Sequence, residues 1–234
     1  HWGVALSPDG RWLAAGNASG ILTIWDWTAR HAVTNFTVPC EFYGKLAFSR
    51  SGNFLFAVAL NNEWVTSTRI WHTGDWKEVA LPGNQSAGLL SVDLSLDDRL
   101  LAAGYQNGAV KLFRFPSGQH ETRFTDNHGI VTAVLFSPNG RELFSTGWDG
   151  SARLWDVSAR RELAKLPGHR GLVNSAALSP DGRRAATGGQ SPRDAVKLWD
   201  LVAHRELLSL QGEGQFFLHV AFSPDGNTLA AVSL

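Results

Sequence analysis

Three side chains that together could perform hydrolytic chemistry are His128, Ser145 and Asp149. A histidine that takes the proton of a serine, oriented by a carboxylate, forms the nucleophilic set of many hydrolases. The chain has no Gly-x-Ser-x-Gly turn to present such a serine, and no oxyanion-hole motif accompanies it. Ser145 also falls inside an expected strand, where its hydroxyl would be enclosed. We therefore expect no catalytic residue here.

Motifs for other chemistry are missing as well. The sequence has no P-loop, no His-Glu-x-x-His pair and no paired carboxylates at metal-binding spacing. Its single cysteine, Cys40, excludes an internal disulfide and a cysteine-based zinc cluster. We expect neither a cofactor nor a metal site.

Charge and hydropathy narrow the choice of partners. Lys and Arg number 21 and are balanced by 21 Asp and Glu, so the chain has no overall attraction for nucleic acid or for an anionic membrane. No apolar run approaches the ~18 residues of a membrane span. We therefore expect no nucleic-acid partner and no membrane association.

The stretch 126–167 is best explained as four short strands separated by turns. The strands are expected at Val131–Phe136, Glu142–Thr146, Ala152–Trp155 and Glu162–Leu166. Ser-Pro-Asn-Gly after the first strand is a type I turn pattern, and Asp-Gly between the second and third is a hairpin signal. Such a sheet cannot cover its own faces, so it needs copies of itself on either side.

Copies of this stretch occur along the whole chain. Turns related to Ser-Pro-Asn-Gly begin at positions 7, 49, 95, 137, 179 and 223, which are 42 to 46 residues apart. An aromatic residue on the third strand keeps the same rhythm at Trp25, Trp71, Phe113, Trp155 and Trp199. A period of ~40–45 residues, with Gly-His early and Trp-Asp late, is typical of propeller blades.

With these motifs the chain resembles the WD-repeat (WD40) β-propeller family over its whole length. The resemblance is most specific at Trp155-Asp156, Gly168-His169 and Trp199-Asp200, and the Ser-Pro-Asp-Gly-Arg turns look bacterial in type. It implies an all-β propeller of four-stranded antiparallel blades, with about five and a half repeats from a partial ring of roughly seven blades. A closed five-blade ring with a loose sixth hairpin is the alternative.

The same resemblance sets the expected domain organisation. We expect a single WD-repeat domain over residues 1–234. Its units are expected at about 1–37, 38–82, 83–125, 126–167, 168–211 and an incomplete 212–234.

The resemblance also implies a buried hydrogen-bond tetrad in the fourth unit, made of His128, Ser145, Asp149 and Trp155. The aspartate would accept from the histidine, and the serine hydroxyl would join the histidine to the indole N–H. The fifth unit carries a partial tetrad whose aspartate is displaced by an insertion, made of His169, Thr187, Asp194 and Trp199. The aromatic anchors Trp25, Trp71 and Phe113 are expected to fill the wedges between blades.

Partners of this family bind on the face that carries the loops between the fourth and first strands and between the second and third. The candidate residues on this face are Trp148, Gln106, Tyr105, Ile130, Arg170, Leu172, Arg193 and Phe216. Trp148 is the strongest candidate, because its turn requires no aromatic residue and interfaces are enriched in tryptophan. Its alternative role is to pack over a neighbouring loop.

The leading hypothesis is a non-enzymatic scaffold that docks a protein or peptide on this loop face, within a larger cytoplasmic signalling or regulatory protein. One alternative is a propeller enzyme of hydrolase or lyase type. Another is a periplasmic propeller with a small-molecule or structural role, against which Trp-Asp and Gly-His argue. The cations that precede the anchors by two positions, Arg69, Lys111, Arg153 and Lys197, are interpreted as a feature of the sheets. The sequence does not indicate an oligomeric state.

Overall fold

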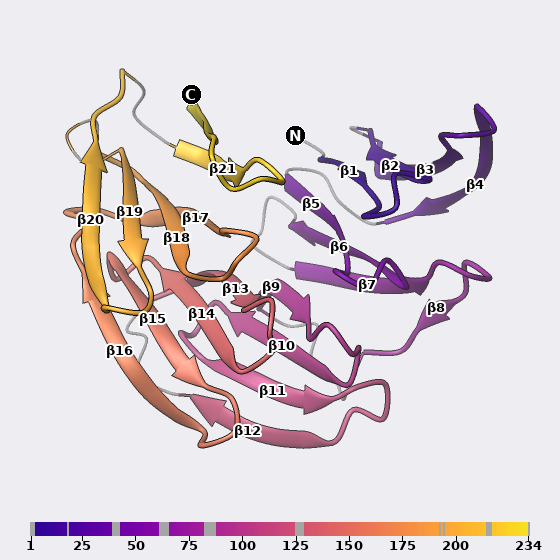
Figure 1. Cartoon of the computed structure of the whole chain (residues 1–234). Helices are drawn as coiled ribbons and strands as arrows, with labels where there is room; N and C mark the ends of the chain where they lie inside the picture. Colours follow the sequence, from indigo (N-terminus) through magenta and orange to yellow (C-terminus); the bar gives the residue numbers. More distant parts are fainter. Residues whose placement is uncertain are drawn as a thin grey trace. The chain divides into compact units, whose positions relative to one another are not determined.

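The computed structural model describes residues 3–17, 19–38, 43–60, 66–81, 88–124, 129–191, 193, 195–213 and 217–233. In this part of the chain the strands form five four-stranded antiparallel sheets and one two-stranded sheet (Figure 1). The all-β fold with four-stranded antiparallel blades, predicted from the sequence, is confirmed. Among the residues described, no helix is long and apolar enough to cross a membrane.

Each four-stranded sheet is a meander in which consecutive strands pair. The first sheet contains β1 (Val4–Leu6), β2 (Trp12–Gly16), β3 (Ile21–Asp26) and β4 (His31–Thr37). The second contains β5 (Tyr43–Phe48), β6 (Phe54–Leu60), β7 (Thr66–His72) and β8 (Glu78–Val79). The third contains β9 (Leu89–Leu94), β10 (Leu100–Tyr105), β11 (Val110–Arg114) and β12 (His120–Phe124).

The remaining sheets repeat the pattern. The fourth contains β13 (Val131–Phe136), β14 (Glu142–Gly147), β15 (Ser151–Asp156) and β16 (Arg161–Pro167). The fifth contains β17 (Val173–Leu178), β18 (Arg184–Gly189), β19 (Val196–Asp200) and β20 (Arg205–Leu210). The two-stranded sheet contains β21 (Phe217–Phe222) and β22 (Leu229–Ser233).

The chain divides into two compact units. One unit is His1–Leu101 with Leu112–Glu121, and the other is Ala102–Lys111 with Thr122–Leu234. The third sheet contributes residues to both units, whereas each of the other sheets lies within one. The expected single domain, with its repeat boundaries, stays a prediction.

The turn between the first two strands of a sheet is closed by a serine. In the fifth sheet the hydroxyl of Ser179 donates to Oδ1 of Asp181 at 2.5 Å and accepts from the backbone N–H of Arg184 at 2.9 Å. Gly182 completes the turn with a φ of 70°, a left-handed conformation that favours glycine. The same serine contacts recur in the other sheets, at Ser7, Ser95, Ser137 and Ser223. The repeated Ser-Pro-Asp-Gly pattern therefore encodes a repeated turn.

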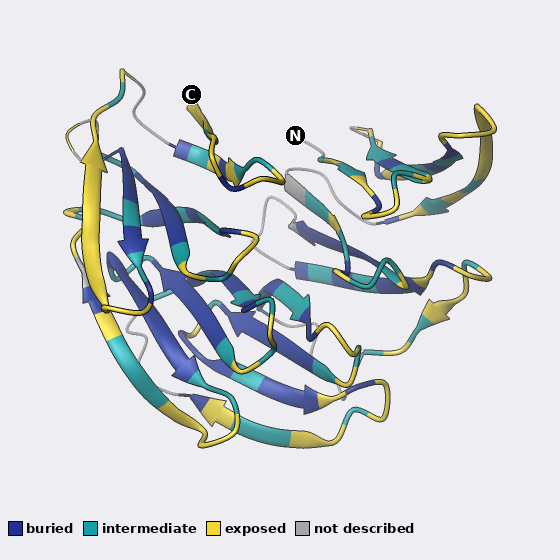
Figure 2. Cartoon of the chain, in the orientation of Figure 1, coloured by how far each residue is buried: buried dark blue, intermediate teal, exposed yellow. Residues whose placement is uncertain are grey.

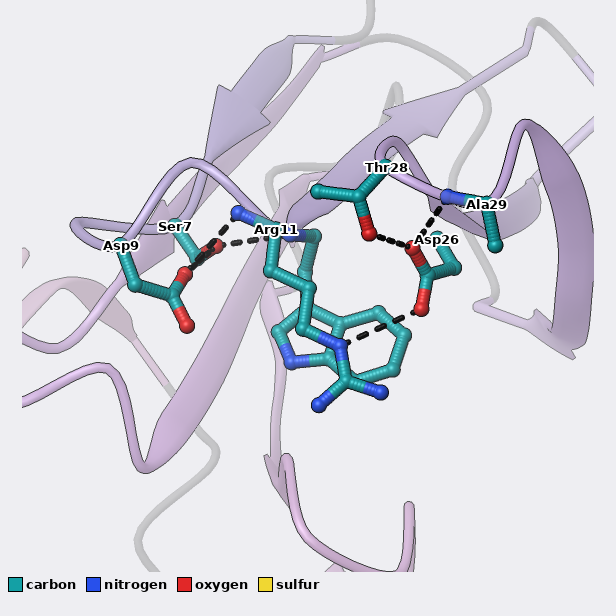
Figure 3. Close-up of polar contacts among 7 residues, drawn as sticks. Ser7, Asp9, Arg11, Asp26, Thr28 and Ala29 are labelled. Carbon is teal, nitrogen blue, oxygen red and sulfur yellow. Dashed lines mark hydrogen bonds and ion pairs between the residues drawn. The ribbon is translucent and has the colours of Figure 1, made fainter.

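The aspartate that follows an anchor closes the turn between the third and fourth strands. Figure 3 shows this arrangement in the first sheet, where Oδ1 of Asp26 accepts from the Thr28 hydroxyl at 2.6 Å and the Ala29 N–H at 2.8 Å. Oδ2 of Asp26 accepts from Nε of Arg11 at 3.2 Å. The hydrogen bond from Thr28, then that from Ala29, holds the pKa of Asp26 at about 2. The aspartate of Trp-Asp is thus a turn residue.

The anchors are buried by the sheet that precedes them. The rings of Phe36 on β4 and Trp71 on β7 stack with centroids 4.7 Å apart. Phe124 on β12 lies 4.7 Å from Trp155 on β15, centroid to centroid. The side chains of Trp71 and Trp155 are 2% and 1% exposed, and their strands are mostly dark blue in Figure 2. At these two interfaces, a residue of the outer strand of one sheet therefore covers the anchor of the next sheet.

Candidate functional site

Trp155 and Ser145 are joined inside the fourth sheet. The indole Nε1 of Trp155 donates to Oγ of Ser145 at 2.8 Å, and both side chains are buried. The two residues lie on neighbouring strands, because β14 pairs with β15. His128, the expected histidine of this set, lies outside the described residues. The Ser145 hydroxyl has no exposed surface and cannot meet a substrate from solvent.

Asp149 accepts hydrogen bonds from its own hairpin. Its Oδ1 accepts from the backbone N–H and the hydroxyl of Ser151, at 3.2 and 2.8 Å, and its Oδ2 accepts from Nη1 of Arg153 at 2.8 Å. Burial acts to raise the pKa of Asp149, but the hydrogen bonds from Ser151 and Arg153 outweigh it, and the pKa is lowered. Asp149 is therefore held as a carboxylate and is poorly suited to donate a proton.

Arg153 is a buried cation that sequence reasoning did not assign to the site. Its side chain is 1% exposed, its Nη1 donates to Oγ of Ser151 at 2.6 Å, and its Nε lies 3.4 Å from Oε2 of Glu162. It stands directly opposite Ser145 in the register of β14 and β15. The sequence has a cation two residues before four of its five anchors, and this spacing was the signal that could have placed Arg153.

In the fifth sheet, Thr187 takes the position of Ser145. The indole Nε1 of Trp199 donates to its Oγ1 at 2.8 Å, and Nε2 of His169 lies 2.7 Å from the same oxygen. Thr187 is fully buried. Asp194, the expected acid of this set, lies outside the described residues. As in the fourth sheet, the hydroxyl forms its hydrogen bonds in the interior of the blade.

The recurring cations of the third strands are engaged within their own sheets. Nη1 of Arg69 lies 2.7 Å from Oε1 of Glu78. Nζ of Lys111 lies 4.6 Å from the ring centroid of Tyr105. In the fifth sheet, Lys197 donates to Oε2 of Glu206 at 2.8 Å and to Oγ of Ser209 at 2.6 Å. Such pairing fits a structural role better than a track for phosphates.

The turns of the fourth and fifth sheets meet at one end of the second unit. The backbone N–H of Trp148 donates to the carbonyl of Ile130 at 2.9 Å. A Cβ on Gly150 would come within 2.9 Å of the His169 carbonyl, so this turn touches the segment that leads into β17. The segment before β17 also approaches the hairpin between β18 and β19, because a Cβ on Gly171 would lie 3.6 Å from Cβ of Gln190.

We call these neighbouring turns the loop surface. It consists of Gln106, Ile130, Trp148, Arg170, Leu172 and Arg193. Arg170 and Arg193 are exposed, and the other four are half-buried. Ile130 and Trp148 adjoin the paired strand ends Val131 and Gly147, and Leu172 adjoins Val173, which pairs with Gly189. On the third sheet, a Cβ on Gly104, two residues before Gln106, would lie 2.6 Å from Cγ1 of Val131.

Two other candidates do not join this surface. Tyr105 is only 4% exposed, and burial raises the pKa of its hydroxyl to about 12. Its ring packs beneath Lys111, so we do not count it among the surface residues. Phe216 lies outside the described residues.

The loop surface combines one aromatic residue, two aliphatic residues, two arginines and one glutamine. Such a mixture is typical of the centre and rim of protein interfaces. Within the described ranges, no group of three or more His, Cys, Asp and Glu side chains could hold a metal ion. The arrangement suits the binding of a polypeptide better than covalent chemistry.

Comparison with known proteins gives one family. The model of "WD domain, G-beta repeat" matches residues 2–26, 118–156 and 160–200. Telomerase protein component 1 of Mus musculus is 30% identical over 189 residues, which cover 80% of this chain and 7% of that protein. WD repeat-containing protein 1 of Xenopus tropicalis is 28% identical over 182 residues, which cover 75% of this chain and 30% of that protein.

A third relative is Actin-interacting protein 1 of Drosophila melanogaster, 28% identical over 186 residues, which cover 77% of this chain and 30% of that protein. The chain thus spans less than a third of the length of these relatives. All three are animal proteins, so the bacterial type expected from the Ser-Pro-Asp-Gly-Arg turns finds no support among them.

Proposed function

We propose that the chain, three stretches of which match the WD-repeat model, is a WD-repeat protein that acts as a non-catalytic scaffold and binds a protein or peptide. The name Actin-interacting protein 1 describes a protein-binding role for one relative and supports the same class of role here. We further propose that the chain acts within a larger signalling or regulatory protein. Its cytoplasmic location and its place in a ring of roughly seven blades stay predictions.

The proposal rests on one observation, which is that the polar side chains expected to do chemistry form hydrogen bonds inside the sheets. The hydroxyls of Ser145 and Thr187 are fully buried and accept hydrogen bonds from tryptophan indoles. The carboxylate of Asp149 is occupied by Ser151 and Arg153. Ser145 and Asp149, which could resemble two members of a hydrolase triad, therefore form hydrogen bonds within their own sheet. A hydrolase or lyase would need reactive groups that open to solvent.

The loop surface supplies what a scaffold needs. Trp148 lies half-buried beside Ile130, so its indole can be covered by a partner at little cost in side-chain entropy. Leu172 adds apolar area from the next sheet, and the exposed Arg170 and Arg193 supply charge at the rim. We propose Trp148 as the central contact. Its competing role, packing over a neighbouring loop, predicts that its loss destabilises the fold.

The test is a quantitative pull-down with the immobilised chain, compared with a variant carrying Trp148→Ala and Arg170→Glu. The matched control is Leu96→Ala, which removes a 52% exposed aliphatic side chain from the turn between β9 and β10, outside the loop surface. Thermal melting must be the same for all three proteins. Loss of a partner in the loop variant alone supports the proposal. A partner set that is the same in all three would place binding outside the loop surface, and hydrolysis of an ester panel would end the non-catalytic proposal.

A further inference from the structure

The chain contains two Asn-Gly pairs, Asn107-Gly108 and Asn139-Gly140. Asparagine is among the chemically labile residues of proteins. It is most labile before glycine, because the backbone nitrogen of a glycine can approach the side-chain carbonyl carbon without obstruction from a Cβ. Both asparagines are exposed to water, but hydrogen bonds hold them to different extents.

Deamidation at such a pair begins when the backbone nitrogen of the glycine attacks Cγ of the asparagine. The bond from Cγ to the side-chain nitrogen breaks, and that nitrogen leaves as ammonia with the proton of the glycine N–H. A five-membered succinimide ring remains. Water then opens the ring at one of its two carbonyl groups, which gives either aspartate or isoaspartate, the latter with one extra carbon in the backbone. Water is the only other reactant, so the contacts of the asparagine and the glycine set the rate.

Asn139 is held firmly in the turn between β13 and β14. Its Oδ1 accepts from the hydroxyl of Ser137 at 2.7 Å and from the backbone N–H of Arg141 at 2.9 Å. The N–H of Gly140, whose nitrogen would have to attack, donates to the Ser137 carbonyl at 2.9 Å. The side chain must leave both donors, and the N–H must leave its acceptor, before the ring can close.

Asn107 is held less firmly, in the hairpin between β10 and β11. Among the residues that the structure describes, its Oδ1 has one donor, the backbone N–H of Ala109 at 3.1 Å. The N–H of Gly108 donates to the Tyr105 carbonyl at 3.2 Å, which is longer than the matching contact of Gly140. Fewer and longer hydrogen bonds therefore oppose ring closure at Asn107 than at Asn139.

An aspartate fits the geometry of position 107, because the hairpin of the fourth sheet has one at the matching position. Oδ1 of Asp149 accepts from the backbone N–H two residues further on at 3.2 Å, and Oδ1 of Asn107 accepts from the same place in its own hairpin. Gly150 and Gly108 follow these two residues with φ values of 76° and 81°. Replacement of the amide by a carboxyl group is therefore compatible with the turn.

A cation also stands at the position that would face the new carboxylate. In the fourth sheet, Nη1 of Arg153 donates to Oδ2 of Asp149, four residues before it, at 2.8 Å. Lys111 follows Asn107 by four residues and is half-buried on β11. Conversion of Asn107 would reproduce this carboxylate-and-cation spacing in the third sheet. It would also add a negative charge beside Gln106 of the loop surface.

We propose that Asn107 is a site of spontaneous deamidation, which gives the hairpin of the third sheet a carboxylate at the position that Asp149 holds in the fourth. The contacts of Asn139 with Ser137 and Arg141 protect that asparagine from the same reaction. The charge of the loop surface therefore changes with the age of the molecule. This chemistry depends on the hairpin alone and is independent of the proposed scaffold function.

The test is the fraction of each asparagine converted while the intact, folded chain is incubated at neutral and at mildly alkaline pH. Trypsin cleaves after Lys and Arg, so peptides 100–111 and 124–141 report Asn107 and Asn139 separately, and tandem mass spectrometry locates the change within each peptide. Asn107 is expected to convert at least about fivefold faster, because one more hydrogen bond holds Asn139. In urea, which removes both turns, the two Asn-Gly pairs should convert at similar rates.

Two variants examine the site and its product. Asn107→Gln should abolish conversion at position 107, because the longer side chain closes to a six-membered ring only slowly, and conversion of Asn139 should stay as in the wild type. Asn107→Asp supplies the aspartate product, and its melting temperature should not fall below that of the wild type.

The proposal would be overturned by equal rates for the two asparagines in the folded chain, or by faster conversion of Asn139. An Asn107 that converts in urea but never in the folded chain would overturn it as well, and so would an Asn107→Asp chain that melts below the wild type. The comparison of the two asparagines uses the wild-type chain and needs no variant to fold. Partner binding at the loop surface is measured separately, so either proposal can fail alone.

Discussion

Nη1 of Arg153 lies 2.8 Å from Oδ2 of Asp149, and this pair crosses the hairpin that presents Trp148. The two side chains are 1% and 11% exposed. Neither can be removed without leaving the other charge in a poorly solvated site. The hairpin that carries the proposed central contact is therefore fixed by a buried ion pair.

Arg153→Ala is expected to destabilise the chain by about 3–5 kcal/mol, because Asp149 would keep a buried charge without its cation. Arg69→Ala is the matched control, at the same position of the second sheet. Its pair with Glu78 is 35% and 48% exposed and should contribute about 0–1 kcal/mol. Urea unfolding measures both free energies. Equal losses in the two variants would contradict the assignment of Arg153 as a buried structural cation.

Thr187→Val is expected to cost about 1–3 kcal/mol, because it leaves the buried indole N–H of Trp199 without its acceptor. The substitution keeps the shape of the side chain, so packing alone would be little changed. Thr187→Ser retains the oxygen and serves as the control. The unfolding free energy should fall more for valine than for serine, and the reverse order would show that packing dominates at this site.

Asp26→Asn is expected to weaken the acid sensitivity of the fold. The pKa of Asp26 is lowered from 3.8 to about 2, first by the Thr28 hydroxyl and then by the Ala29 N–H. A carboxyl whose pKa is lower in the folded state stabilises the fold above pH 3.8, and this contribution is lost as the pH falls from 3.8 to about 2. Thermal melts across that window should show a shallower pH dependence for Asp26→Asn than for the wild type and for a Glu213→Gln control. The same pH dependence of melting in Asp26→Asn and in the wild type would contradict this expectation.

His204→Gly is expected to stabilise the chain by about 0.5–1 kcal/mol, because His204 has a φ of 53° and glycine adopts this left-handed conformation without strain. Gly118 holds the corresponding position of the third sheet with a φ of 76°. Gly118→Ala should therefore destabilise by a similar amount. Chemical unfolding of both variants checks the pair, and a loss of stability in His204→Gly would contradict the expectation.

The sequence predicted the architecture because its landmarks encode local geometry. Ser-Pro-Asp-Gly specifies a turn through the contacts of Ser179, and Trp-Asp specifies another through Asp200, whose Oδ1 accepts from the N–H groups of Val202 and Ala203 at 2.9 Å. These contacts reach no further than a few residues. Period and turn chemistry were therefore sufficient to predict four-stranded antiparallel sheets.

The contacts of the candidate site were harder to predict from the sequence, because each polar side chain could form hydrogen bonds with several different partners. Asp149 was expected to serve a histidine, and in the described residues it accepts from Ser151 and Arg153. Tyr105 was expected at the surface and is buried beneath Lys111. Spacing shows that two side chains share a strand, but burial decides which of them a partner protein can reach.

The stacking of Phe36 on Trp71, and of Phe124 on Trp155, also determines how the chain should come apart. In both pairs the anchor of one sheet is closed by a residue of the sheet before it, so the energy is shared between nearest neighbours. The free energy of unfolding of such a chain is approximately the sum of the intrinsic stability of each sheet and the interaction energy between each pair of neighbouring sheets. Damage to one anchor should therefore spread to the adjoining sheet first and reach distant sheets only weakly, which permits partly folded states in which one run of sheets persists without the rest.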